Sequence, residues 1–352
     1  MTVVPLLGSF VEATADEAVT FRDREKKRLG PLKRRLFSER ARRNGMYCGA
    51  RREFCLHEDF GAENLEAGIR DAALAYFKDR AIGWHAGEGD VPSNHLCCSQ
   101  SCCVNFWFPF VQAPDRLGAV LRGLGYDVEK MLVIEADCTL RDCTCPYVAF
   151  EWIGKLNYLG ELRRGEVALD DGRTRGANFT SLDFCLRFRR SDGRIQLVAG
   201  EWKYTEYYPK GVNLRLSQSK TDRLDRIYGK HLVKPDCQIA GDVPHESLFF
   251  DPFDQLMRQQ LLCTAMERCR EMEADVVTLL HVAPRANREL MRRITSKELE
   301  GVGSDIHSIW DALTLPGRFK GVATEDLLPL VCANAPTSQT REYLELRYGG
   351  MA

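Results

Sequence analysis

The chain has 352 residues, 44% of them apolar and 28% charged, which is typical of a globular protein with one large domain or two smaller ones. Its formal net charge of −1 excludes a general attraction to nucleic acid or to anionic membranes, so any basic surface must be local. No run of about 18 apolar residues is present, and acids stand where a signal peptide would be basic, so we expect a cytoplasmic protein without a membrane contact.

The first distinctive segment is a basic run at residues 21–43, which holds eleven Lys or Arg and three acids. The Gly30-Pro31 pair within it predicts two short helices with a break between them. A solvated helical face is the ordinary interpretation of such a run. The alternative is contact with nucleic-acid phosphates, for which the candidates are Lys33, Arg34 and Arg35, together with Lys210 and Lys220 from a later basic stretch.

Apolar spacing predicts helices in the first third of the chain, and the pattern then changes to that of strands. The helices are expected at residues 62–80, 98–108 and 113–125, and the strands at residues 128–137, 147–154, 180–188 and 194–205. A polar connection of some forty residues follows. Beyond it we expect a long helix at 251–273, a buried strand at 275–284, and short helices near 288, 304 and 324. Strands grouped between helical blocks indicate an α/β or α+β fold with three layers.

Fourteen cysteines are many for a cytoplasmic chain, and seven of them form two clusters. The clusters are Cys97, Cys98, Cys102 and Cys103, and Cys138, Cys143 and Cys145. Such clusters could hold zinc or an iron-sulfur centre. Their spacing is not that of paired Cys-x-x-Cys motifs, and cysteine is often a small buried residue, so packing is the favoured interpretation.

The segment "SLDFCLRFRRSDGRIQLVAGEWKYTEYY", residues 181–208, reads as a hairpin. Its turn signal is Ser-Asp-Gly at 191–193, a three-residue loop with Gly where a positive φ is needed. A loop of that length places Asp183 directly opposite Glu201, and the two-residue strand period puts Lys203 on the same face. A two-residue loop would instead send the two acids to opposite faces of the sheet.

Two acids opposite each other on neighbouring strands repel, so something must offset their charge. A divalent cation does so, and the hard oxygen ligands of Asp183 and Glu201 suit Mg²⁺. Lys203, on the same face, could then orient or help deprotonate the water that attacks a phosphate and neutralise developing charge. The competing interpretation of Glu-x-Lys is an ordinary surface ion pair. It is disfavoured by the apolar "QLVAG" that runs into the pair and by the neighbouring Trp and Tyr.

An Asp, a hairpin and then Glu-x-Lys resemble the signature of the PD-(D/E)xK nuclease superfamily, which has the restriction-endonuclease-like fold. The motifs "HLCCSQSCCVNFWFPF", "YLGE", "QLMRQQLLCTAME" and "LHVAPRANREL" make the sequence similar to a prokaryotic family of nucleases in this superfamily. The resemblance covers about residues 95–330. It implies an α/β fold with a mixed central sheet flanked by helices, here with a helical N-terminal extension. Leu182 stands in place of the proline of the superfamily name.

Carried over position by position, the resemblance implies roles for four residues of the hairpin. Asp183 and Glu201 would be metal ligands, Trp202 would lend its main-chain carbonyl to the metal, and Lys203 would be the catalytic lysine. Many members add a further upstream acid. Glu151 and Glu161 are the candidates, and we expect Glu161.

The resemblance also implies that the long helix after the hairpin approaches the site. Gln255, Arg258 and Gln259 on that helix are the candidates, against the alternative of a solvated helical face. His281 ends a buried strand and is interpreted as a hydrogen-bonded core histidine.

These inferences predict a metal-dependent nuclease that uses Mg²⁺ or Mn²⁺ to activate water and cleaves nucleic acid, expected to be DNA. The alternatives are a non-catalytic protein of the same fold that binds nucleic acid or a partner, and a zinc or iron-sulfur protein centred on the cysteine clusters. We expect three parts: a helical basic region at 1–94, the nuclease-like domain at 95–330, and a tail at 331–352. The sequence leaves open whether the protein forms a homodimer.

Overall fold

The predicted hairpin lies at the centre of the structure, a computed structural model that describes residues 19–135, 146–175, 179–240 and 242–351. Its strands are β7 (Leu182–Arg189) and β8 (Ile195–Trp202), which run antiparallel. The Arg190 N–H donates to the Arg194 carbonyl over 2.9 Å, which closes a loop of three residues. Gly193 in this loop has a φ of +82°, a conformation that its missing Cβ permits.

The register of the hairpin agrees with the sequence prediction. Phe184 pairs with Gly200, so Asp183 and Glu201 occupy the next facing positions along the two strands. The three-residue loop therefore brings both acids to the same end of the hairpin.

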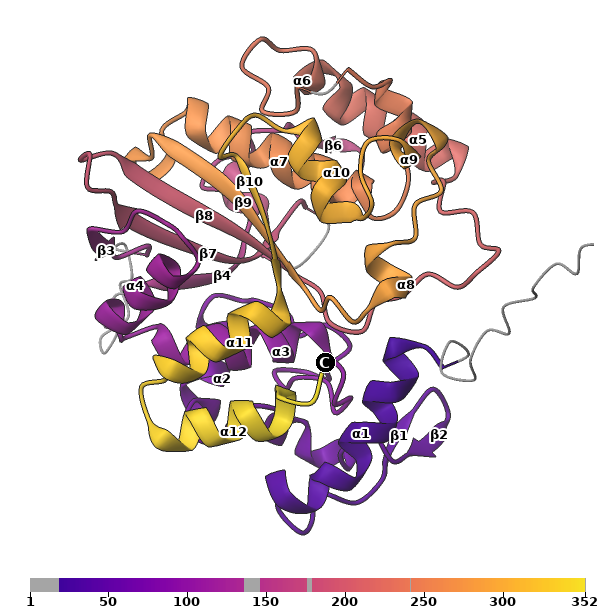
Figure 1. Cartoon of the computed structure of the whole chain (residues 1–352), viewed down its shortest axis with the longest axis vertical. Coiled ribbons are helices and arrows are strands. Elements are labelled where there is room, and N and C mark those ends of the chain that lie inside the picture. Colours follow the sequence, from indigo (N-terminus) through magenta and orange to yellow (C-terminus); the bar gives the residue numbers. More distant parts are fainter. Residues whose placement is uncertain (1–18, 136–145, 176–178, 241, 352) are drawn as a thin grey trace, which may run out of the picture.

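The hairpin belongs to a mixed sheet of six strands (Figure 1). β9 (Val276–Ala283) runs parallel to β8, and β10 (Phe319–Ala323) runs parallel to β9. On the other side, β3 (Lys130–Leu132) and β4 (Val148–Trp152) both pair antiparallel with β7, at opposite ends of that strand. Every residue of β9 is buried, which fits a central strand covered on both faces.

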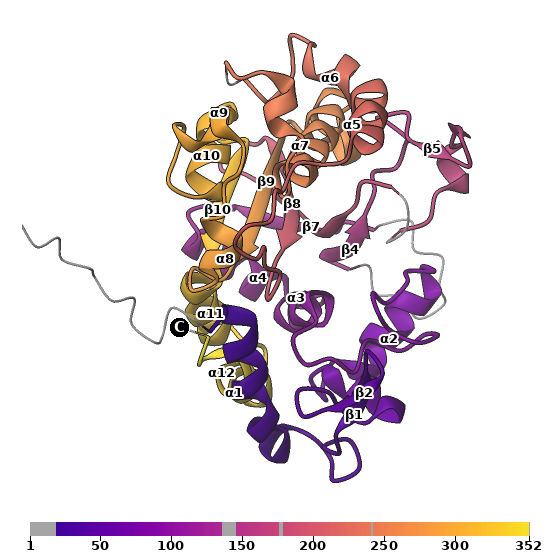
Figure 2. The same ribbon diagram turned by 90° about the vertical axis from the view of Figure 1, so that its right-hand side faces the viewer.

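Helices cover both faces of this sheet, and each face has its own apolar core. Figure 2 shows α7 on one side of the strands and α3 on the other. The first face packs against α3 (Ser99–Trp107), α4 (Pro114–Gly123), α11 (Thr324–Ala333) and α12 (Ser338–Tyr348), and the second against α7 (Phe253–Arg268) and α10 (Ile306–Leu313). The predicted α/β fold, a mixed central sheet flanked by helices, is confirmed.

The remaining α-helices and strands lie around this three-layer centre, and all of them except α1 are short. They are α1 (Phe21–Leu36), β1 (Gly45–Tyr47), β2 (Ala50–Arg52), α2 (Arg70–Asp79), β5 (Leu162–Arg163), β6 (Glu166–Val167), α5 (Gln218–Leu224), α6 (Lys230–Leu232), α8 (Arg288–Met291) and α9 (Lys297–Glu300). No helix in the described ranges is long and apolar enough to cross a membrane.

Two local predictions differ from the structure. The basic run does not break at Gly30-Pro31, because α1 continues through Pro31 as one helix. Phe21 and Leu29 of this helix are buried, so packing offsets the hydrogen bond that proline cannot donate. The helix expected at 62–80 is shorter, because a 3₁₀ segment at Glu58–Asn64 precedes α2.

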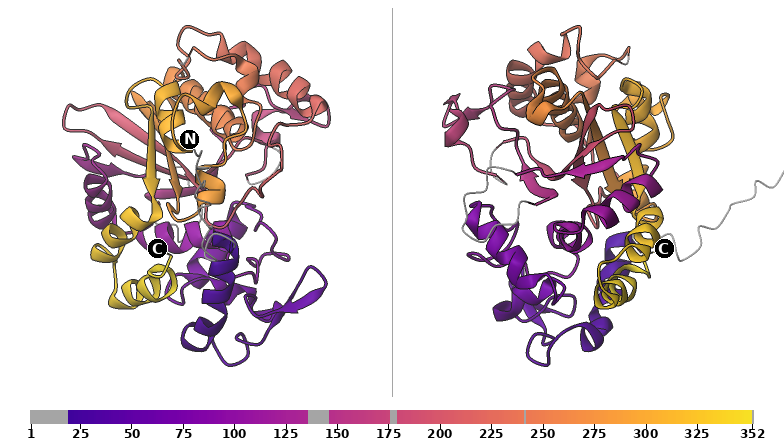
Figure 3. Two further views of the ribbon diagram at one scale, coloured as in Figure 1. Left: turned by 45° about the vertical axis from the view of Figure 1, so that its right-hand side comes forward. Right: turned by 90° about the vertical axis from the view of Figure 1, so that its left-hand side faces the viewer.

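The two ends of the described chain meet in one core. Figure 3 shows the indigo N-terminal helix beside the yellow C-terminal helices, and α1 contacts α12 directly. The apolar cluster on the α3 face of the sheet extends from Phe21 to Met351. The three-part division of the chain stays a prediction, but residues of all three parts contribute to this cluster.

Candidate active site

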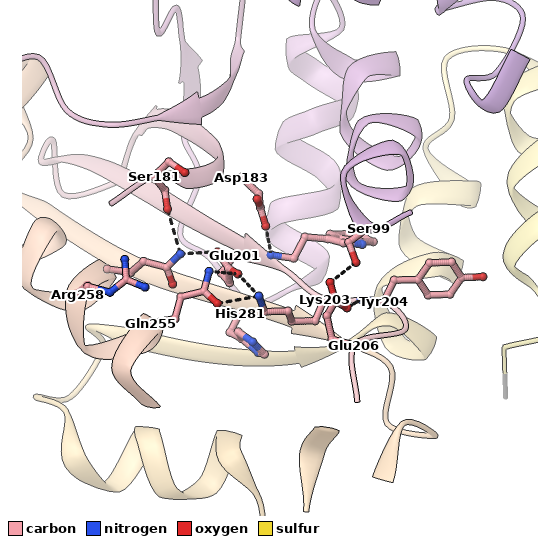
Figure 4. A network of polar contacts seen from close by, with 12 residues as sticks. Ser99, Ser181, Asp183, Glu201, Lys203, Tyr204, Glu206, Gln255, Arg258 and His281 are labelled. Atoms are coloured by element: carbon pink, nitrogen blue, oxygen red, sulfur yellow. Dashed lines mark hydrogen bonds and ion pairs between the residues drawn. The ribbon is translucent and has the colours of Figure 1, made fainter. Parts of the chain in front are cut away.

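Glu201 and Lys203 lie in direct contact at the end of β8 (Figure 4). The Lys203 Nζ is 2.7 Å from the Glu201 Oε1 and 2.8 Å from the Gln255 Oε1, to which it donates. The Gln255 Nε2 donates to the same Glu201 oxygen over 2.8 Å. The three side chains therefore form a closed ring of hydrogen bonds, which fixes the ammonium group beside the carboxylate.

The second Glu201 oxygen is held by Gln259, one helical turn after Gln255 on α7. The Gln259 Nε2 donates to this oxygen and also to the Ser181 carbonyl, 3.0 Å away. Residues four apart share one face of a helix, so both glutamines reach the same carboxylate. Arg258 lies beside them but forms its ion pair within α7, 3.4 Å from Asp254. The structure thus brings Gln255 and Gln259 to the hairpin and leaves Arg258 at its side.

Asp183 reaches the backbone of the opposite strand. Its Oδ2 accepts the Trp202 N–H over 2.6 Å, one residue from Glu201 (Figure 4). Burial and the nearby charges of Glu201 and Glu151 raise the pKa of Asp183 well above its ordinary value, although Lys203 and the Trp202 N–H act in the opposite direction. The site therefore holds more negative charge than one ammonium group balances.

Glu151 is the third acid in this group. It is 8% exposed, and its carboxylate accepts hydrogen bonds from Gln100 over 2.8 Å and from the Ser181 hydroxyl over 3.2 Å. Burial raises the pKa of Glu151, and the charge of Glu201 adds to the rise.

The backbone explains how Glu151 reaches the site from β4. Its φ is +50°, in the left-handed region that side chains other than Gly rarely adopt. On either side of it, Phe150 packs in the core on one face of the sheet and Trp152 in the core on the other, although alternate strand residues normally share a face. The turn at Glu151 thus interrupts the alternation of the strand.

Glu161 occupies a separate polar cluster. Its Oε1 accepts from the Thr180 N–H over 2.8 Å, from the Thr180 hydroxyl over 2.6 Å and from the Tyr228 hydroxyl over 2.6 Å. The carboxylate is buried and already hydrogen-bonded in this cluster, and it is not among the charges that raise the pKa of Asp183, whereas Glu151 is.

His281 lies directly across from Glu201 on the neighbouring strand β9, and Gly321 of β10 follows in the same row. A Cβ on Gly321 would overlap the His307 ring, so the glycine makes room for that histidine. The His281 Nδ1 is 2.8 Å from the His307 Nε2, while the His281 Nε2 is buried without a hydrogen-bond partner. His281 is hydrogen-bonded and buried, as the sequence suggests, but it also belongs to the row of site residues, which a single sequence could not show.

Lys203 remains a cation in this environment. Burial by itself lowers the pKa of a lysine, but the carboxylates of Glu201, Glu206 and Asp183 outweigh it and raise the pKa of Lys203 above its ordinary value. The side chain is therefore an ammonium group at neutral pH. It can donate hydrogen bonds and stabilise negative charge, whereas it has no lone pair with which to accept a proton from water.

In the described ranges, no three or more His, Cys, Asp or Glu side chains lie together in a group that could hold a metal ion, but the chemistry of the acids at the hairpin suits a divalent cation. Asp183, Glu201 and Glu151 have hard oxygen atoms, and burial together with their mutual repulsion raises the pKa values of Asp183 and Glu151. Mg²⁺ and Mn²⁺ prefer such ligands and would relieve this repulsion.

The first cysteine cluster is part of the apolar core. Cys97, Cys102 and Cys103 are buried, and burial raises the pKa of each thiol, which disfavours the thiolate that a metal requires. This agrees with the packing interpretation. The second cluster, Cys138, Cys143 and Cys145, lies outside the described residues.

A family model described as "Restriction Endonuclease associating with ARP" matches residues 27–349. The chain belongs to this restriction endonuclease family. Membership makes it a nuclease and confirms the resemblance inferred from the sequence. The match also begins well before the residue 95 at which the resemblance was expected to start. No curated protein and no solved structure matched the chain.

The five basic residues predicted to contact nucleic acid differ in their exposure to solvent in this restriction endonuclease. Arg34, Arg35, Lys210 and Lys220 are exposed. Lys33 is only 3% exposed, and its ammonium group donates to the Asn44 Oδ1 and the Cys55 carbonyl, each over 2.9 Å. Lys33 therefore ties α1 to the loop that follows it, whereas the other four side chains face solvent.

Proposed function

We propose that this restriction endonuclease hydrolyses phosphodiester bonds of DNA at the group formed by Glu151, Asp183, Glu201 and Lys203, with a divalent cation as cofactor. The observation that carries the proposal is the Glu201–Lys203 contact at 2.7 Å on β8, next to the strand that presents Asp183. Family membership supports cleavage of DNA as the reaction.

Asp183, Glu201 and Glu151, with the Trp202 carbonyl, would hold the cation. A bound Mg²⁺ or Mn²⁺ would supply Lewis acidity toward water and phosphate oxygen and would neutralise charge. Glu151 replaces Glu161 as the proposed further acid, because its charge contributes to the raised pKa of Asp183 and the charge of Glu201 contributes to the raised pKa of Glu151.

The protein's own groups orient the phosphate and stabilise charge. Lys203 donates hydrogen bonds to a phosphate oxygen as negative charge builds up during in-line attack by water. Gln255 holds Lys203 and Glu201 in a fixed geometry, and Gln259 holds the other Glu201 oxygen. Departure of the 3′ oxygen leaves a 5′-phosphate on the product. The exposed Arg34, Arg35, Lys210 and Lys220 are the proposed contacts to the sugar-phosphate backbone.

The experiment that tests the proposal compares cleavage of supercoiled, linear and single-stranded DNA with Mg²⁺, with Mn²⁺ and with EDTA. The wild type should cleave at least one of these substrates only when a divalent cation is present. Lys203→Met and Glu201→Gln should lower the rate by about 10³-fold or more.

The matched control is Glu166→Gln, which removes an exposed acid of β6 and should cleave like the wild type. Cleavage by Lys203→Met at the wild-type rate would refute the proposed site. Binding of DNA by a wild type that cleaves none of the substrates would favour the non-catalytic alternative.

A further inference from the structure

A cavity of about 210 Å³ lies beside the lysine end of the site. Its walls come from parts of the chain that are distant in sequence, including Arg22 of α1, Tyr47 of β1, His95, Ser99 at the start of α3, and Glu206 after β8. Glu206 connects the cavity to the site, because its carboxylate is one of the charges that raise the pKa of Lys203. Figure 4 shows Glu206 and Ser99 next to the Lys203 segment.

His95 lines this cavity, and its ring holds a hydrogen-bond donor without a partner. Its Nδ1 accepts the Cys97 N–H over 3.0 Å, so the proton of the neutral ring is on Nε2. The residue is only 6% exposed, and its Nε2 is buried without a hydrogen-bond partner. Burial and the charges of Arg22 and Lys26 lower its pKa to about 4, so the ring is neutral at physiological pH. A buried donor without an acceptor is costly, and a ligand atom with a lone pair would satisfy it.

The charged and aromatic side chains around the cavity indicate which kind of ligand it could bind. Arg22 forms no ion pair with a carboxylate in the described part of the chain, and its guanidinium lies 5.7 Å from the centre of the Tyr207 ring. The Tyr47 ring stands edge-on to His95 with 4.6 Å between ring centres. The acid in the wall, Glu206, already accepts from the Ser99 hydroxyl over 2.5 Å and from the Tyr204 N–H over 2.7 Å. The cavity thus combines an available cation, aromatic rings and one free donor.

This combination of groups suits a ligand that is a single nucleotide unit. An arginine suits the phosphate, aromatic rings suit the face of a base, and a ring N–H suits a carbonyl or ring nitrogen at the base edge. The cavity is smaller than the 300 Å³ or more of a typical drug-sized site, which favours a single base over a larger group.

We propose that this cavity, lined by Arg22, Tyr47, His95 and Glu206, binds one nucleotide of the substrate strand next to the bond that is cleaved. The base would be unstacked from its neighbours and held in the cavity, while its phosphate stays near Arg22. This inference rests on the proposed function, since it names a subsite for the same nucleic-acid substrate.

The test measures binding of 5′-deoxynucleoside monophosphates to the full chain by calorimetry in EDTA, with deoxyribose 5-phosphate as the ligand that lacks a base. The wild type should bind at least one of the four nucleotides tenfold more tightly than the sugar phosphate. His95→Phe keeps an aromatic ring without the donor, and Tyr47→Leu removes a ring from the cavity wall. Each should weaken nucleotide binding at least tenfold. Arg22→Gln should weaken binding of nucleotide and sugar phosphate alike.

His245→Phe, a histidine outside the cavity, is the matched control and should bind like the wild type. The second variant keeps the test valid if His95→Phe does not fold. Equal affinity for nucleotides and sugar phosphate would overturn the proposal, and so would wild-type affinity in folded His95→Phe and Tyr47→Leu proteins. The measurement needs no cleavage, so it can fail while the nuclease proposal holds, and the reverse is also true.

Discussion

Three carboxylates and one ammonium group share the end of the hairpin, and the balance among them decides what each residue can do. One Glu201 oxygen accepts from Lys203 and Gln255 and the other accepts from Gln259, which fixes the position of that carboxylate. Asp183 and Glu151 have fewer donors, and their pKa values rise as a result of burial and mutual repulsion. Burial and repulsion thus oppose the ionisation of these two acids, so they are the groups that a cation or a substitution should affect most.

Substitution of the two candidate upstream acids separates their roles. Glu151→Gln should lower kcat/KM for cleavage of linear DNA by about 100-fold or more, because it removes a charge that acts directly on Asp183. Glu161→Gln should stay within about threefold of the wild type and lose about 1 kcal/mol of stability, because its contacts are with Thr180 and Tyr228. Initial rates and urea unfolding measure the two effects. A larger loss of rate in Glu161→Gln than in Glu151→Gln would instead indicate that Glu161 is the functional acid.

The crowding of acids also predicts a stability effect of metal without any measurement of cleavage. A cation that binds only the folded state should stabilise the wild type by about 1.4 kcal/mol at tenfold excess over its Kd, and thus raise its Tm. Asp183→Asn removes one repelling charge, so its Tm in EDTA should equal or exceed that of the wild type. Its Tm should respond little to Mg²⁺ or Mn²⁺.

Asp171→Asn, at an exposed position, is the control for this experiment and should show the full metal response. A large loss of stability for Asp183→Asn in EDTA would contradict the repulsion argument. Thermal unfolding followed by circular dichroism is sufficient to decide it.

At the scale of the element, the close approach of β7 and β8 positions the site. A Cβ on Gly200 would overlap the Phe184 ring, which is fully buried and packs against Trp107 with ring centres 4.7 Å apart. The Phe184 ring therefore occupies the space where a side chain at position 200 would lie. Because Gly200 has no side chain, the apolar core can pack up to the residue next to Glu201.

Gly200→Ala should lower the free energy of unfolding by about 1–3 kcal/mol, because the added methyl group has no space in a packed core. It should also lower cleavage activity, since Glu201 is the next residue. Gly83→Ala is the matched control, since a Cβ there meets no atom within 4 Å, and it should change stability by less than about 0.5 kcal/mol. An unchanged urea midpoint for Gly200→Ala would show that the ring can move aside.

The elements that local sequence determines were predictable, and those that depend on distant packing were not. The loop at 191–193 fixes the register by its length alone, so the facing of Asp183 and Glu201 followed from the sequence. The left-handed turn at Glu151 has no local signal, since neither Gly nor Asn marks it. The row from Glu201 to His281 depends on how β9 docks beside β8, which is a contact between residues 80 apart in sequence.

At the scale of the whole molecule, the first and last helices complete one core rather than forming appendages to it. Arg347 of α12 is fully buried, and its guanidinium donates to the Asn64 carbonyl over 2.7 Å and to the Leu96 carbonyl over 3.0 Å. It also donates to the Asn64 side chain. One residue of the expected C-terminal tail thus satisfies backbone groups from the expected N-terminal region and from the start of the nuclease-like domain.

Arg347→Leu should therefore cost about 3 kcal/mol or more, because it leaves several buried acceptors without a donor. The loss should affect the whole protein. Urea unfolding followed by tryptophan fluorescence and by far-UV circular dichroism should give coincident single transitions in the wild type, and both should shift together in the variant. Glu342→Leu, at an exposed position of the same helix, is the control and should shift the midpoint little. Two separate transitions in the wild type, with only one of them shifted by Arg347→Leu, would instead show that the N-terminal region and the sheet domain unfold independently.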